Sequence, residues 1–266
     1  MGKNHWKRIF MEVLYMIPKI IHFCWLSDDP FPKKIQRCIN SWKKQFPDYE
    51  IIHWSTKNFD IHRNKWVEQA YNSGDFAVVA DYVRFYALYT IGGIYLDSDV
   101  EVLDSFEDFF KYKCFFSYEY TGLPEAAVVG AEKGTPWLKN ALDWYDRQSF
   151  LNENGTKNRV IAPLILKYAF ETGTDFVLCD DEKIHDVDGN LVLTYEYFSP
   201  KNGFSGMMYD SENTIAIHHF NSAWLKPGVM RKAKKFVHLF LIRILGKKAY
   251  NRFMYKYRPR FKSLQK

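Results

Sequence analysis

Hydrophobic residues along the chain occur in two spacings, and together these predict alternating strands and helices. Short apolar runs between polar or glycine-containing segments predict strands at residues 20–25, 49–54, 94–100, 114–118, 126–130, 176–179 and 214–219. Apolar residues three and four positions apart predict helices at residues 32–46, 65–72, 76–91, 136–147 and 160–172. The alternation predicts an α/β domain with a mostly parallel sheet, whose ligands bind at the carboxyl ends of the strands.

Two acids end one of these apolar strands. Asp97 and Asp99 are separated by one residue, and alternate residues of a strand point to the same side, so the two carboxylates are expected to face together. Because like charges repel, a cation is expected to join them, and a hard divalent ion that carries phosphate oxygens fits this position. Gly92 and Gly93, directly before the strand, predict a sharp turn into it.

The acid pair has a plainer alternative interpretation as a capped strand end in solvent. The apolar residues before it favour a binding site, since strands rarely bury charges that nothing compensates. Upstream, Asp81 and Arg84 lie three positions apart on an expected helix, where they can pair and face one site. An exposed pair is the alternative, and the apolar residues 77–80 make it less attractive.

Composition narrows the class of protein. The 266 residues, 47% of them hydrophobic, suffice for one large domain or for one domain with an appendage. No apolar run approaches the length that crosses a bilayer, and residues 1–16 lack the long apolar core and cleavage site of a signal peptide. The four cysteines form no CxxC pair, so structural zinc and a disulfide framework are not expected, and a reducing, cytoplasmic location is.

Charge divides the chain into two parts. Residues 226–266 hold fourteen of the 37 Lys and Arg and no acid, so the preceding 225 residues hold 23 basic and 31 acidic side chains. The basic tail also contains many large apolar side chains, a mixture typical of helices that lie on anionic membranes. The alternative is a C-terminal helix packed on the core with its charged face in solvent. The acidic body argues against nucleic acid as a partner.

Several segments of the chain occur in an order that resembles a known family. These segments are Ile17-Pro18-Lys19-Ile20-Ile21-His22, Asp81-x-x-Arg84, Gly92-Gly93-x-Tyr95-x-Asp97-x-Asp99, and His218-His219 followed by Ser222-x-Trp224. Over residues 17–227 they resemble the DXD sugar-binding glycosyltransferases of the family 32 type, which include initiating mannosyltransferases and capsule enzymes. They are also similar to the glucosyltransferase domains of clostridial toxins.

The resemblance implies a fold, a division of the chain and a cofactor. The fold is of the GT-A type, a Rossmann-like mixed sheet flanked by helices. Residues 1–227 would form the catalytic domain, and residues 228–266 a basic amphipathic helical extension. The partners would be a nucleotide-sugar donor and Mn²⁺ or Mg²⁺, and the sugar would keep its anomeric configuration.

The resemblance also assigns donor-binding residues. Trp25 matches the residue that stacks on the donor base, and Tyr95 matches a tyrosine that contacts the donor. Asp81 and Arg84 match residues that hold hydroxyl groups of the donor sugar. Asp97 matches an acid that contacts the ribose and, directly or through water, the metal. With Asp97 and the residue at position 99, Arg84 would form the catalytic centre.

The remaining matches concern the metal and the diphosphate. Asp99 matches the direct metal ligand, and Ser222 and Trp224 match a loop that closes over the diphosphate, with Ser222 next to the metal. Lys226, just beyond, could clamp a phosphate oxygen. The toxins place an acid where this chain has His219, so His219 is expected as the third protein ligand. His218 would then point away, into the core.

The leading hypothesis is a retaining, metal-dependent glycosyltransferase that acts in surface polysaccharide or glycolipid synthesis at the inner face of the membrane. UDP-sugars are the favoured donors, but GDP-mannose stays open, and the acceptor is a saccharide or is linked to a lipid. A covalent route would need a carboxylate beneath the sugar, for which Glu119 is the candidate. The alternatives are a metal-dependent nucleotide-sugar hydrolase or phosphotransferase, and a non-catalytic nucleotide-sugar binding module.

Overall fold

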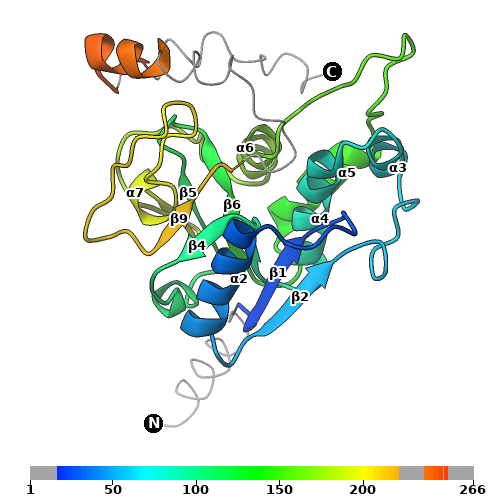
Figure 1. Cartoon of the computed structure of the whole chain (residues 1–266), viewed down its shortest axis with the longest axis horizontal. Coiled ribbons are helices and arrows are strands. Elements are labelled where there is room, and N and C mark those ends of the chain that lie inside the picture. Colours follow the sequence, from blue (N-terminus) through cyan, green and yellow to red (C-terminus); the bar gives the residue numbers. More distant parts are fainter. Residues whose placement is uncertain (1–16, 222–236, 248, 251–266) are drawn as a thin grey trace.

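A seven-stranded sheet runs through the centre of the protein, as a computed structural model shows (Figure 1). The structure describes residues 17–221, 237–247, 249 and 250. In spatial order the strands are β2 (Glu50–Trp54), β1 (Ile20–Cys24), β3 (Gly93–Leu96), β6 (Pro124–Ala131), β5 (Cys114–Tyr118), β8 (Asn190–Leu193) and β7 (His185–Val187). A separate two-stranded sheet pairs β4 (Val100–Val102) with β9 (Ala216–His218).

Helices cover both faces of the large sheet, and each face has its own hydrophobic core (Figure 1). One core contains α3 (Lys65–Asn72), α4 (Phe76–Thr90), α5 (Pro136–Asp146) and α6 (Ala162–Gly173). The other contains α2 (Lys33–Gln45), β4, a 3₁₀ turn (Glu107–Phe109) and the short α7 (Tyr195–Phe198). Successive side chains of β3 point to opposite cores: Tyr95 packs in the first core, whereas Ile94 and Leu96 pack in the second.

Strand directions bring five carboxyl ends to one edge of the sheet. β1 is parallel to β2 and β3, β8 is parallel to β5, and β6 is antiparallel to both β3 and β5. The carboxyl ends of β2, β1, β3, β5 and β8 therefore share an edge, which we call the catalytic edge. The α/β class and the mixed sheet flanked by helices are confirmed, and most strands run in one direction, with β6 and β7 running against them. β6 returns directly from β5 through a tight turn, in which Glu119 N–H donates to the Leu123 carbonyl at 2.8 Å.

Local patterns predicted the helices better than the strands. All five predicted helices are present, with ends that differ by at most two residues. The predicted strand at 94–100 is instead two strands, because the chain turns at Asp97, whose carbonyl accepts from Val100 N–H at 2.9 Å. Residues 176–179 form no strand, and β7 and β8 were not predicted.

Two glycines set the position of β3 against its neighbours. Gly92 and Gly93 have φ values of 79° and 113°, which confirms the predicted turn. A Cβ atom at Gly93 would lie 2.5 Å from the Ile20 carbonyl oxygen, and one at Gly92 would lie 2.6 Å from Lys133 N. A side chain at either position would therefore push β3 away from β1 and move the acids that follow it.

The described residues of the C-terminal extension, 237–247, 249 and 250, are helical (Figure 1). The helix contacts the body through Lys247, whose Nζ lies 3.1 Å from Glu182 Oε1. Within the described ranges of the chain, no helix combines the length and the hydrophobicity that spanning a membrane requires.

Candidate active site

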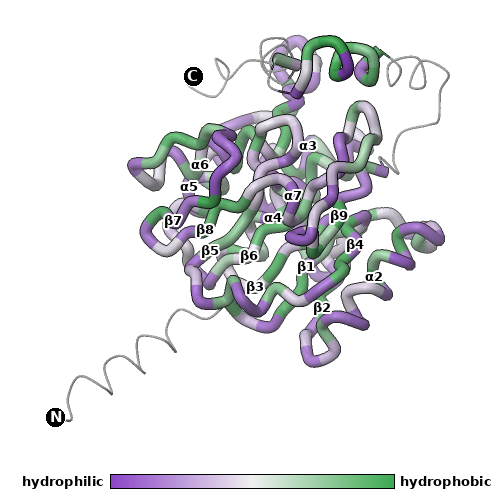
Figure 2. Tube along the Cα trace, turned by 90° about the vertical axis from the view of Figure 1, so that its left-hand side faces the viewer, coloured by the Kyte–Doolittle hydropathy of each residue, from purple (hydrophilic) through white to green (hydrophobic). Residues whose placement is uncertain are grey.

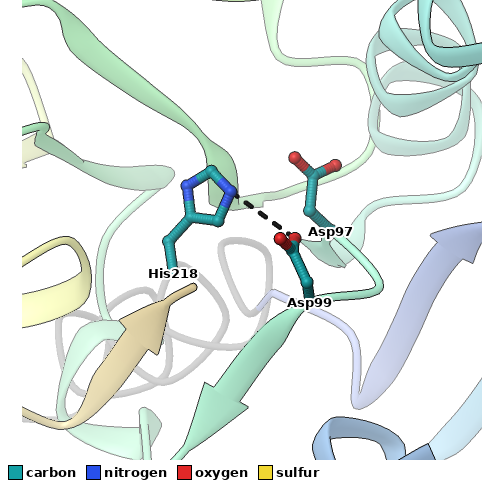
Figure 3. A group of neighbouring side chains, drawn as sticks. All are labelled: Asp97, Asp99 and His218. Carbon is teal, nitrogen blue, oxygen red and sulfur yellow. Dashed lines mark ion pairs between the residues drawn. The ribbon is translucent and has the colours of Figure 1, made fainter. Parts of the chain in front are cut away.

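The two acids of the motif lie in the turn that joins the two sheets. Asp97 follows β3 of the large sheet, and Asp99 precedes β4 of the small one. Because β4 pairs with β9, with Val100 opposite His218, the imidazole of His218 lies beside Asp99 (Figure 3). Its Nε2 is 3.5 Å from Asp99 Oδ1. Asp97, Asp99 and His218 each offer one ligand atom, and these atoms lie within 4.8 Å of one another.

A buried arginine holds Asp97 from the side of α4. Arg84 Nη2 donates to Asp81 Oδ1 at 2.9 Å and to Asp97 Oδ1 at 3.0 Å. Its Nη1 donates to the Ala126 carbonyl, and its guanidinium lies 4.9 Å from the centroid of the Tyr95 ring. Since only 5% of the Arg84 side chain is exposed, the alternative of an exposed helical pair is wrong. These contacts bring together four residues that the sequence predicted for one site.

Burial and charge shift the pKa values of Asp97 and Asp99 in opposite directions. Burial raises the pKa of Asp97, although Arg84 and His218 oppose it. Burial also acts to raise the pKa of Asp99, but the charge and hydrogen bond of His218 and the Asn221 N–H outweigh it and lower that pKa to about 2. The Asn221 N–H donates to Asp99 Oδ2 at 2.7 Å. Burial raises the pKa of Asp81 to about 7, and Arg84 limits the rise.

A second buried carboxylate orients His218, and the sequence prediction missed it. Glu125, at the start of β6, places Oε2 3.1 Å from His218 Nδ1, while its Oε1 accepts from Ala127 N–H at 2.8 Å. Burial lowers the pKa of His218, but Glu125 and Asp99 outweigh burial and raise it well above its usual range. The signal in the sequence was a single acid in the apolar run around residues 123–131, where an uncompensated charge would be costly.

The expectation for His219 is corrected. His219 Nε2 lies 2.8 Å from Glu101 Oε2, on the side of β4 that Arg37 also contacts, and it is not part of the Asp97–Asp99 group. His218 and His219 do point to opposite sides, as neighbouring residues of an extended segment are expected to. The choice between the two histidines depends on the register of β9 against β4, which sequence spacing does not give.

The other predicted residues are less tightly connected to the acids. Trp25 directly follows β1 at the catalytic edge, where its Nε1–H donates to the Asp29 carbonyl at 3.2 Å and its half-buried ring packs against Phe31. Stacking on a donor base stays a prediction. Ser222, Trp224 and Lys226 lie outside the described residues. Glu119 is buried and accepts from Thr121 Oγ1 at 2.8 Å, and its place beneath a sugar also stays a prediction.

The residues present fit a divalent ion. Two carboxylates and one imidazole form a mixed oxygen and nitrogen set that Mn²⁺ tolerates well. Imidazoles that bind metals commonly donate their second ring N–H to a carboxylate, as His218 does to Glu125. Asp99, Asp97 and His218 Nε2 would therefore hold the ion.

Comparison with a protein family agrees with this geometry. Residues 32–116 match the family described as "Glycosyltransferase sugar-binding region containing DXD motif". The matched range includes the Arg84 ion pairs and both acids of the turn. The resemblance to DXD sugar-binding glycosyltransferases is confirmed for this part of the chain.

Individual relatives give more specific names. The chain is 32% identical over 151 residues to inositol phosphoceramide mannosyltransferase 3 of Schizosaccharomyces pombe, covering 55% of this chain and 42% of that protein. It is 29% identical over 172 residues to inositol phosphoceramide mannosyltransferase 1 of the same organism, covering 58% and 51%. The match therefore spans about half the length of these relatives. Among solved structures, the PaToxG glycosyltransferase matches with a TM-score of 0.47 and 18% identity, covering 64% of this chain and 76% of that one.

Proposed function

We propose that the protein is a metal-dependent glycosyltransferase that uses a nucleotide-sugar donor. One observation carries the proposal. The ligand atoms of Asp97, Asp99 and His218 lie within 4.8 Å of one another at the catalytic edge, and both acids belong to the matched sugar-binding region. A diphosphate that carries a sugar is the ligand that such a charged group, once metal-loaded, is suited to bind.

The side chains around the acids have separable tasks in this proposal. Arg84 holds Asp97 in place with Asp81, and its permanent charge favours the ionised form of Asp97 against the effect of burial. Glu125 fixes the ring of His218 so that Nε2 faces Asp99. A bound divalent ion would neutralise the charge that develops on the leaving nucleoside diphosphate. Retention of the anomeric configuration is part of the proposal and rests on the resemblance between the motifs.

The names of the relatives bear on donor and acceptor. Both are named mannosyltransferases, which adds weight to GDP-mannose among the donors that the sequence leaves open. Both are also named for inositol phosphoceramide, which adds weight to a lipid-linked acceptor over a soluble saccharide. A role in surface polysaccharide synthesis stays a prediction from the resemblance.

Thermal unfolding in the presence of candidate donors tests the proposal. A ligand that binds only the folded protein raises the melting temperature by an amount that grows with the ratio of its concentration to its Kd, so GDP-mannose and UDP-sugars are compared with and without Mn²⁺. At about 100 times the Kd, stabilisation of about 2.7 kcal/mol corresponds to a shift of several degrees. The proposal expects one donor to stabilise the wild-type protein only when Mn²⁺ is present, and Asp99→Asn to abolish the shift. Equal shifts with both proteins would contradict it.

Product analysis separates transfer from hydrolysis. With the stabilising donor, a transferase releases nucleoside diphosphate faster when a lipid-linked or saccharide acceptor is added. Donor cleavage at one rate with every acceptor would instead identify a hydrolase. Proton NMR of the new glycosidic bond reports its anomeric configuration, and an inverted product would refute retention alone.

A further inference from the structure

The helix at residues 237–247 has apolar side chains on two opposite faces. Its inner face packs on the body, where Ile242 is only 9% exposed and the ring of His238 lies 4.9 Å from that of Phe204. Its outer face is exposed to solvent and forms a stripe, because its members are three, four and one residues apart. The outer residues are Val237, Phe240, Ile244 and Leu245, which are 53%, 57%, 63% and 41% exposed.

The helix is held on the body by specific contacts, so the stripe has a defined direction. Lys247 Nζ lies 3.8 Å from the centroid of the Tyr195 ring and 5.1 Å from that of Tyr120, in addition to its ion pair with Glu182. Tyr250 is fully buried, and its hydroxyl lies 3.0 Å from His238 Nδ1. Apolar residues colour much of this helix green in Figure 2, where it lies at one end of the molecule.

A second element with exposed apolar side chains neighbours the helix. The loop before β9 exposes 38% of Phe204, 41% of Met207 and 41% of Met208. The Phe204 ring contacts His238, so this loop packs on the inner side of the helix. We call the four outer residues of the helix the docking face. Exposed apolar patches of this kind are typical of binding surfaces.

Charge around the helix indicates what the docking face binds. Arg231, Lys232, Lys234 and Lys235 precede the helix in the sequence, Lys248 and Arg252 follow it, and residues 226–266 contain no acid. Arg243 is exposed on the helix itself. A second copy of this chain would bring an equally cationic tail to the face, so like charges oppose self-association there. Apolar side chains flanked by cations complement an anionic lipid surface.

We propose that the docking face binds the surface of an anionic lipid bilayer. The apolar stripe enters the boundary between headgroups and acyl chains, and the flanking cations contact the lipid headgroups. Binding of this kind needs neither donor nor metal, and so it stands independently of the proposed enzymatic activity.

The position of the helix determines on which side of the candidate active site a bound membrane would lie. Tyr120 and Tyr195 each lie two residues beyond a strand, β5 and β8 respectively, so Lys247 rests on side chains at the catalytic edge. Asp97 lies at the same edge, after β3. The bilayer would therefore lie on the side of the protein where the acids are, within reach of an acceptor that is anchored in lipid. This second step rests on the proposed function.

Sedimentation with lipid vesicles tests the docking face. The full-length protein is mixed with phosphatidylcholine vesicles or with vesicles that contain about 30% phosphatidylglycerol, without donor or metal. Wild-type protein is expected to bind the anionic vesicles at least about tenfold more tightly than the neutral ones. The double variant Phe240→Gln/Ile244→Gln, which keeps good helix formers, is expected to lose about tenfold or more of that affinity. The matched control is Phe76→Gln, at an exposed phenylalanine on α4, and it is expected to bind as the wild type does.

Three results would overturn the proposal. One is equal binding of the wild-type protein to neutral and anionic vesicles. Another is wild-type affinity of the double variant, which would assign binding to the cations alone. The third is a wild-type dimer, in size-exclusion chromatography, that the double variant dissociates, since the face would then be an interface between copies. Equal melting temperatures of the variants and the wild type confirm that folding is intact.

Discussion

Asp97 and Asp99 are two residues apart, yet they belong to different electrostatic regions of the protein. The region around Asp97 is built on α4 and β3, and its cation is Arg84. The region around Asp99 is built on β4, β9 and β6, and its cation is His218, held in turn by Glu125. Burial raises the pKa of Asp97, whereas the pKa of Asp99 is lowered to about 2.

The two cations differ in whether they can lose a proton, and this difference gives the two regions different roles. An arginine in a protein does not lose its proton, so the Arg84 region is a permanent ion-pair network. An imidazole can give up its proton and offer a lone pair to a metal, so the His218 region can exchange a proton for an ion. The first region should therefore control the folding stability, and the second should control metal affinity. Substitutions of Asp99, Arg84, His218 and Glu125 test this division, and a fifth, of His22, lies outside both regions.

The largest effect is expected from Asp99→Asn. Loss of the charged ligand should abolish detectable Mn²⁺ binding by calorimetry and reduce sugar transfer about a thousandfold or more. Glu101→Gln is the matched control, because Glu101 lies on β4, two residues after Asp99, but pairs with His219 outside the group. Wild-type turnover of Asp99→Asn after treatment with a chelator would remove the metal from the proposal.

Arg84→Met should act on stability. The substitution leaves Asp81 and Asp97 near each other without their cation, and breaking such a buried network lowers the free energy of unfolding by about 3 kcal/mol. Urea unfolding measures the loss. Arg37→Met removes an exposed arginine that also pairs with an acid, and it should change stability by at most about 1 kcal/mol. Similar losses of unfolding free energy in Arg84→Met and Arg37→Met would mean that the Arg84 region does not control the folding stability.

The two adjacent histidines form a matched pair for the other region. His218→Ala should lower the affinity for Mn²⁺ and the rate of transfer about a hundredfold, because it removes a ligand of the group. His219→Ala should leave both within about threefold, since that ring contacts Glu101. Calorimetry with Mn²⁺ alone separates binding from turnover. The opposite ranking would restore His219 as the third ligand.

Glu125→Gln should have a smaller effect of the same kind. The amide keeps the shape of the side chain but loses the charge that orients His218, and changes beside a metal ligand reduce metal affinity about tenfold to a hundredfold. Electron paramagnetic resonance of bound Mn²⁺ measures the affinity without substrate. Unchanged affinity would make Glu125 a purely structural partner of Ala127.

The smallest effect concerns His22, a buried histidine that contacts the Gly92 carbonyl and Trp54. Burial lowers the pKa of His22. Trp54 Nε1–H donates to Nδ1 of His22 at 3.2 Å, so protonation of Nδ1 would place two N–H donors against each other. A lowered folded-state pKa gives stability that is present above about pH 6.5 and is lost as the pH falls below that value. Between pH 7.5 and 5.5 the wild-type protein should lose about 1 kcal/mol of unfolding free energy more than His22→Gln. Exposed His62→Gln is the control, and it should show the full wild-type loss.

Local spacing was enough to predict the Arg84 region. Asp81 and Arg84 share one helix face, and Tyr95 and Asp97 follow within the next strand, so short-range geometry brings them together. The five helices were predictable for the same reason, because each has its own apolar period. The β7–β8 hairpin also carried a local signal, which the prediction missed: Asp188-Gly189 is a typical two-residue hairpin turn, and both residues have positive φ.

The Asp99 region could not be derived in this way. Whether His218 or His219 faces Asp99 is decided by the pairing of β9 with β4, more than a hundred residues earlier in the chain. Glu125 enters only because β6 lies next to β3 in the sheet. The turn at Asp97 that splits the predicted strand is also the feature that lets the two acids join different sheets.

The small β4–β9 sheet separates the scaffold from part of the proposed ion site along the chain. All seven strands of the large sheet precede residue 194, whereas β9 begins at Ala216. A chain terminated at residue 215 would therefore contain every strand of the large sheet and would lack His218, one of the three proposed ligands.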